Sequence, residues 1–168
     1  MLNLFTRGKK CRHAAERLYA ALVTRAREPV FFERLGVPDT LDGRFDLVAL
    51  HAWLVLAHIR DDARLAQALV NRIFVGFDEA LREMGAGDIG MGRRMKKMAD
   101  AFYGRLTAYS EAGDEASMTA ALLRNLYRGT ATPAAATMAH YVMGARSVLT
   151  VAGEGGLNFG PLPGEEMA

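Results

Sequence analysis

The 168-residue sequence has little cysteine, no long apolar run and almost no net charge, and each shortage excludes a class of protein. Its single cysteine, Cys11, rules out an internal disulfide and fits a reducing compartment. The longest apolar run, residues 47–59, is interrupted by His51 and His58 and is shorter than the roughly 20 residues that cross a bilayer. Because the formal net charge is only +2, no global field draws the protein to nucleic acid, and we expect no DNA binding.

The N-terminus lacks a secretory signal, because the charges of residues 1–11 follow a very short apolar stretch. We therefore expect a soluble protein that keeps its N-terminus. A chain of this length builds a single core. We assign residues 1–152 to one helical domain, and residues 153–168, which have no helical pattern, to a flexible tail or an arm laid over the surface.

Apolar residues recur three and four positions apart almost everywhere, and alternating β-branched residues are absent, which predicts an all-α bundle. We expect about six helices, at about residues 11–27, 42–60, 62–84, 91–110, 114–129 and 133–149. The second has apolar residues all round its cylinder and therefore belongs in the middle of the bundle. The connection at residues 29–40 is too apolar for a solvated loop, so we expect it to pack down with a short turn of helix.

We find no motif that supports catalysis, which needs a nucleophile, an acid or base, or a metal in fixed geometry. The glycines of residues 85–92 follow a helix and lack the lysine and hydroxyl of a phosphate-binding loop. His51 and His58 are about 10 Å apart along one line of a helix, too far for one metal ion. They either give that helix its polar line or bind haem or another outside ligand. We expect no enzyme activity, no metal and no cofactor.

The helix expected at residues 91–110 carries two contrasting faces. Its apolar stripe belongs either to the core or to an adaptable client groove, since thioether side chains suit both; it comprises Met91, Met95, Met98, Phe102, Leu106 and Tyr109. The opposite face presents Arg93, Lys96 and Lys97. These residues are either a solvated surface or a contact for ribosomal RNA or anionic headgroups.

Two arginines of this helix differ from the rest of the basic face. Arg94 and Arg105 fall along the edge of the apolar stripe, where their stems can cover core residues. We therefore expect them to pair with carboxylates of a neighbouring segment, and Asp88 and Glu83 are the candidates.

Residues 81–109 form a composite signature of a glycine turn, Arg-Arg-Met-Lys-Lys at 93–97 and Phe-Tyr-Gly-Arg at 102–105. This segment closely resembles the signature of the ubiquinol-cytochrome c chaperone family. Residues 32–53 resemble the earlier block of the same family, in the right order and at about the right distance. The likeness covers roughly residues 14–149.

The resemblance implies a helical assembly chaperone of the cytochrome bc1 complex that binds newly made cytochrome b and promotes its assembly. Mitochondrial members work near the ribosomal exit with a small partner protein, so we expect contact with the ribosome and with a small helical partner. The sequence lacks the targeting extension of those members and resembles the bacterial form, which implies a cytoplasmic location with peripheral contact at the inner membrane. The alternatives are a scaffold subunit of a bc1 assembly intermediate and a helical enzyme.

We expect the client and partners to contact the glycine turn and the helix that follows it. The candidate contact residues are Asp88, Met91, Arg93, Arg94, Lys96, Lys97, Phe102, Tyr103 and Arg105.

Overall fold

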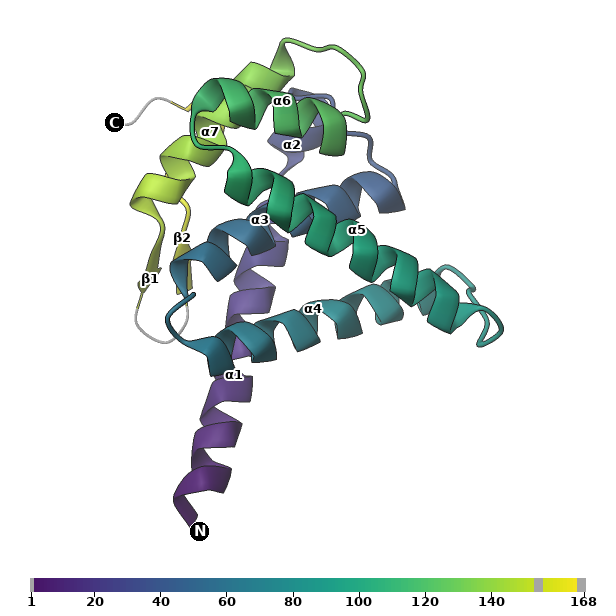
Figure 1. Ribbon diagram of the computed structural model, residues 1–168, viewed down its shortest axis with the longest axis vertical. Coiled ribbons are helices and arrows are strands. Elements are labelled where there is room, and N and C mark those ends of the chain that lie inside the picture. Colours follow the sequence, from purple (N-terminus) through teal and green to yellow (C-terminus); the bar gives the residue numbers. More distant parts are fainter. Residues whose placement is uncertain (1, 153–155, 166–168) are drawn as a thin grey trace.

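The computed structural model describes residues 2–152 and 156–165 and confirms the all-α prediction. Seven helices and a small antiparallel hairpin of two strands follow one another along these residues (Figure 1). The elements are α1 (Leu2–Ala26), α2 (Pro29–Glu33), α3 (Leu41–His58), α4 (Ala63–Glu83), α5 (Met91–Glu111), α6 (Glu115–Asn125), α7 (Ala134–Val148), β1 (Thr150–Ala152) and β2 (Gly156–Asn158). The short helix α2 is the turn of helix expected in the apolar connection.

Helix α3 is the central element, as its apolar circumference predicts. Leu50, Trp53 and Leu54 are each no more than 3% exposed, and α1, α5 and α7 all contact α3. The N-terminus of α3 is capped by Thr40, whose side chain accepts a hydrogen bond from the backbone N–H of Gly43 at 3.1 Å.

Helices α4 and α5 form a hairpin whose glycine turn projects from the body of the protein (Figure 1). Gly85 and Gly90 adopt φ values of +84° and +82°, a left-handed conformation that favours glycine. These two glycines turn the chain, Gly85 just after the end of α4 and Gly90 just before the start of α5. The N-terminal half of α1 also extends beyond the bundle (Figure 1).

Two predicted helix ends differ by more than two residues from those in the structure. Helix α1 begins at Leu2 rather than near residue 11. Residues 7–10 of this added part are exposed, so no apolar pattern marks them as helical in the sequence. Helix α6 ends at Asn125 rather than near Gly129, since Arg128 and Gly129 take φ values of 53° and 81° and turn the chain. The other predicted ends lie within two residues of those observed, and α7, for example, begins one residue later than predicted, after Pro133.

Residues 156–165 lie as an arm over the surface of the helical bundle. Phe159 is only 3% exposed, and Arg25 of α1 donates hydrogen bonds from Nη2 to the carbonyl oxygens of Gly160 and Pro161, both at 2.9 Å. Residues 153–155 and 166–168, which belong to the predicted tail, lie outside the described residues.

Candidate functional site

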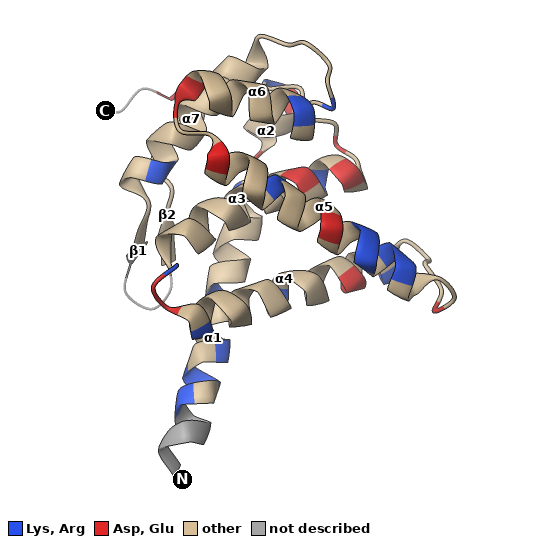
Figure 2. Ribbon diagram, viewed as in Figure 1, with Lys and Arg blue, Asp and Glu red and all other residues tan. Residues whose placement is uncertain are grey.

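The candidate contact residues divide between the surface of α5 and the core beneath it. Arg93, Arg94, Lys96 and Lys97 are exposed, and they form the cluster of blue ribbon at the start of α5 in Figure 2. We call these four residues the basic face.

The apolar stripe of α5 lies mainly in the core. Met91 is 6% exposed and Phe102 is fully buried, whereas Met95 and Met98 are half-buried. Tyr103, beside Phe102, is 48% exposed. In this fold, Tyr103 is therefore open to a partner, while Met91 and Phe102 support the surface from below.

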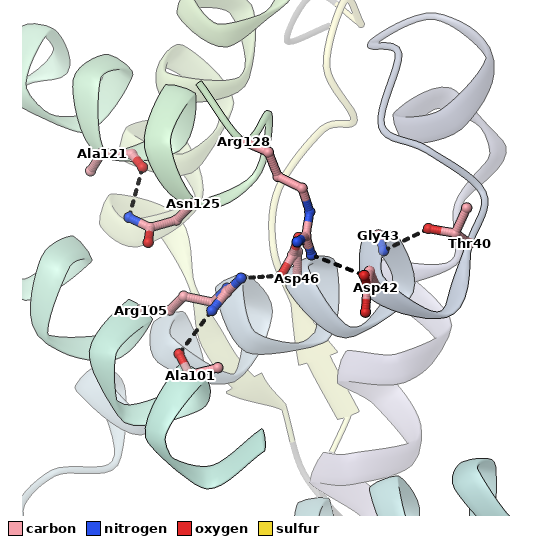
Figure 3. Close-up of polar contacts among 9 residues, drawn as sticks. All are labelled: Thr40, Asp42, Gly43, Asp46, Ala101, Arg105, Ala121, Asn125 and Arg128. Atoms are coloured by element: carbon pink, nitrogen blue, oxygen red, sulfur yellow. Dashed lines mark hydrogen bonds and ion pairs between the residues drawn. The ribbon is translucent and has the colours of Figure 1, made fainter. Parts of the chain in front are cut away.

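Arg105 pairs with a carboxylate as expected, but that carboxylate is neither of the two predicted candidates, Asp88 and Glu83. Its Nη2 lies 2.7 Å from Oδ1 of Asp46 on α3 (Figure 3). The Asp46 side chain is fully buried. Asp88 is instead paired with Arg82, at 2.8 Å. Sequence reasoning considered only carboxylates close to α5 in the chain, whereas α5 packs across α3. Arg94 forms no salt bridge with the residues that the structure describes.

A second arginine reaches Asp46 from the other side, through the loop after α6. Nη2 of Arg128 donates to Oδ2 of Asp46 at 3.1 Å and lies 3.6 Å from Asp42 (Figure 3). We call Asp46, Arg105 and Arg128 the ion cluster. Sequence reasoning overlooked Asp46 and Arg128, although an acidic residue within a helix that has no polar face was a signal for a buried pair.

Burial and the neighbouring charges shift the pKa of Asp46 in opposite directions. Desolvation raises the pKa of Asp46 to about 6, and the nearby guanidiniums of Arg105 and Arg128 oppose that rise. The Arg105 side chain is fixed further by donating from Nη1 to the carbonyl of Ala101 at 3.0 Å and by lying 5.2 Å from the centre of the Phe45 ring. The cluster thus joins α3, α5 and the loop after α6.

The two histidines of α3 have different surroundings. His58 is exposed, whereas His51 is fully buried, with Nδ1 2.8 Å from the carbonyl oxygen of Leu47 and Nε2 2.9 Å from the hydroxyl of Tyr141. A carbonyl only accepts, so Nδ1 carries the proton and Nε2 accepts from Tyr141. Arg25 Nε in turn donates to that hydroxyl at 2.9 Å. Burial lowers the pKa of His51 to about 4, so at neutral pH His51 is an uncharged link in this chain of hydrogen bonds.

The remaining candidate chemistry is sparse within the described part of the chain. No three side chains of the His, Cys, Asp and Glu types come together there as a metal site, and none of its helices is long and apolar enough to cross a bilayer. Cys11 is half-buried on α1. His140 lies 3.3 Å from Glu115 on the surface.

Known proteins are similar to this chain in sequence and in fold. A sequence model described as ubiquinol-cytochrome C chaperone matches residues 33–154. A protein of Xenopus laevis called ubiquinol-cytochrome-c reductase complex assembly factor 1 is 29% identical over 123 residues, which cover 70% of this chain and 62% of that protein. The Homo sapiens protein of the same description is 27% identical over 124 residues, covering 70% of this chain and 42% of its own length.

A solved structure is similar over most of the chain. The crystal structure of the Cbp3 homolog from Brucella abortus has a TM-score of 0.76 and 36% sequence identity, with 87% of this chain and 86% of that chain covered. The matched residues 33–154 include the ion cluster and the basic face. Sequence and fold therefore agree that this chain belongs to the ubiquinol-cytochrome c chaperone family.

Proposed function

We propose that this protein is an assembly chaperone of the cytochrome bc1 complex that binds newly made cytochrome b and promotes its assembly without a covalent step. The observation that carries the proposal is the family match, which spans residues 33–154 and so includes the whole α3–α5 unit. The relatives from Xenopus laevis and Homo sapiens are described as assembly factors of ubiquinol-cytochrome-c reductase. This chain spans 62% and 42% of their lengths.

The surface of the α4–α5 hairpin supports this function, because it combines apolar and basic side chains. Met84 is 66% exposed and Ile89 is 97% exposed at the turn, and Tyr103 is 48% exposed along α5. Exposed apolar side chains can shield a segment of a membrane protein before its helices pack. The hairpin is therefore the surface that we assign to the client.

The basic face gives the same hairpin an attraction for anions. We propose that Arg93, Lys96 and Lys97 hold the chaperone near the ribosomal exit or at the anionic inner surface of the membrane, from the cytoplasmic side. A small helical partner protein, which the family resemblance implies, would share this task.

Charge reversal tests the role of the basic face. Replacing Arg93, Lys96 and Lys97 with Glu should leave folding nearly intact, because all three side chains are exposed. The variant should lose association with ribosomes or membranes and, in a deletion strain, should restore less cytochrome b than the wild type. Added salt should weaken wild-type binding in the same assay.

A matched control reverses the same number of exposed charges elsewhere. Arg17, Arg60 and Arg124 are exposed and lie outside the α4–α5 hairpin, so their replacement with Glu should leave both readouts unchanged. If the R93E/K96E/K97E variant sediments as the wild type does and restores the bc1 complex, the basic face is only a solvated surface. Cross-linking to nascent cytochrome b separates this chaperone from a scaffold subunit, which would not retain the unassembled client.

A further inference from the structure

A cavity of about 320 Å³ opens beside the ion cluster. It lies where the start of α3, the end of α4, residues 94–105 of α5 and the loop after α6 meet. Four cationic side chains line it, namely Arg94, Lys97, Arg105 and Arg128. Two of them belong to the ion cluster and two to the basic face, so the cavity joins those two features.

The cations around this cavity outnumber the acids available to them. Asp46 lies beneath it and is shared by Arg105 and Arg128, and Asp42 lines it 3.6 Å from Arg128. Arg94 and Lys97 form no salt bridge within residues 2–152 and 156–165. The cavity therefore has an excess of positive charge and attracts an anion.

Arg105, which lines the cavity, is not fully hydrogen-bonded within the described protein. Its Nη1 donates to the carbonyl of Ala101, and its Nη2 is ion-paired with Oδ1 of Asp46 at 2.7 Å. Its Nε and Oδ1 of Asp46 are both buried without a hydrogen-bond partner among the described residues. Asp46 therefore leaves a guanidinium at the cavity wall that is ion-paired but not fully hydrogen-bonded.

Between the cations, the wall of the cavity is apolar, which restricts the kind of molecule to which the bound anionic group belongs. Phe45, Leu81 and Met98 line it, from α3, α4 and α5 respectively. A bare inorganic anion would leave these side chains in contact with water. An acidic side chain flanked by apolar residues satisfies both the cations and the wall, since it brings a carboxylate for the guanidiniums and covers the apolar surface. A flat bilayer would meet the projecting turn rather than this recess.

We propose that this cavity is a docking site for an acidic side chain, flanked by apolar residues, of a protein partner. Arg94 and Lys97 contact its carboxylate, while Asp46 holds the guanidiniums of Arg105 and Arg128 in place beneath it. The site rests on the proposed function only in requiring a protein partner, and it does not depend on which protein that is.

The test is a titration of the full chain with a short peptide, acetylated and amidated Gly-Leu-Glu-Leu-Gly, followed by the ¹⁵N NMR signals of the arginine Nε–H groups. The peptide should shift the Arg105 and Arg94 signals. Its analogue with Gln in place of Glu should bind about tenfold more weakly, because a hydrogen bond to a charged group exceeds a neutral one by that order.

A pair of double variants on α5 provides the control. R94Q/K97Q removes two charges from the cavity, whereas R93Q/K96Q removes two exposed charges that do not line it. The first should weaken binding of the Glu peptide about tenfold, and the second by no more than about twofold at physiological salt. Circular dichroism should show both variants folded.

Three results would overturn the proposal. The first is equal binding of the Glu and Gln peptides, and the second is an equal loss of binding in the two double variants. The third is that the peptide does not bind, whereas inorganic phosphate or phosphatidylglycerol vesicles bind in a way that depends on Arg94 and Lys97. The assay contains neither cytochrome b nor ribosomes, so its failure would leave the proposed function standing.

Discussion

Removing the guanidinium of Arg105 should destabilise the protein by about 2–4 kcal/mol at neutral pH. Breaking a buried ion pair by removing one partner typically costs about 3–5 kcal/mol, because the other charge stays buried. Asp46 is fully buried, but Arg128, whose side chain is half exposed, still reaches its Oδ2 at 3.1 Å and recovers part of that cost. Methionine is the replacement of choice, since it keeps the apolar stem that packs near Phe45.

The cost of R105M should also depend on pH. Burial already raises the pKa of Asp46 to about 6, and loss of Arg105 removes one of the charges that lower it. The folded variant therefore takes up a proton on Asp46 at a higher pH than the unfolded chain does, which relieves the unpaired charge as the pH falls. The wild-type Asp46 also takes up a proton over this range, so we expect the destabilisation to shrink by up to about 1.4 kcal/mol between pH 7 and pH 5.

Urea unfolding followed by circular dichroism at pH 7 and pH 5 measures both effects. R93M, an exposed change on the same helix, should cost less than about 0.5 kcal/mol at either pH. The double variant D46N/R105M should be less destabilised at pH 7 than R105M alone, because no charge is left unpaired. A cost of R105M below about 1 kcal/mol at pH 7, or one that is equal at the two pH values, would refute the reasoning.

Three further changes test the core and the backbone. L54A should cost about 2–5 kcal/mol in a urea titration, because Leu54 is 2% exposed on the central helix; a loss below about 1 kcal/mol would contradict that placement. His51, with a pKa of about 4 in the fold against 6.5 ordinarily, contributes stability that is complete above pH 6.5 and declines as the pH falls toward 4. The wild type should therefore lose up to about 1.4 kcal/mol per pH unit more than H51Q across that range, and parallel pH curves would exclude the effect. G43A should cost at least about 1 kcal/mol, because its Cβ would overlap the carbonyl oxygen of Pro38, whereas G104A, with nothing within 4 Å of its Cβ, should stabilise α5 slightly; similar melting temperatures for the two variants would argue against this contrast.

The helices could be predicted from the sequence because each carries its own pattern. The apolar residues all round α3 mark it as a buried helix without any knowledge of its neighbours. The start of α1 could not be found in this way, because residues 7–10 are exposed and exposed residues leave no apolar pattern.

The candidate site was only half predictable, for a related reason. The exposed positions of Arg93, Lys96 and Lys97 follow from helical spacing alone. The carboxylate that Arg105 finds does not, because helix packing decides it, and Arg128 reaches the same carboxylate from 82 residues away. Pairing by distance along the chain favours Asp88, whereas pairing in space requires knowing that α5 crosses α3.

The contacts of Arg25 have a consequence for the order in which this protein folds. Arg25 sits near the end of the first helix, yet it donates to the carbonyl of Gly160, 135 residues later, and to Tyr141, whose hydroxyl bonds to His51 on the central helix. Contacts between such distant positions form late and slow folding. During synthesis, α1 and α3 can meet early, but the polar groups between them gain their partners only after residues 141–161 have been made. The core is therefore closed only after residues 141–161 have been made, and until then the protein itself exposes the kind of apolar surface that it is proposed to shield on its client.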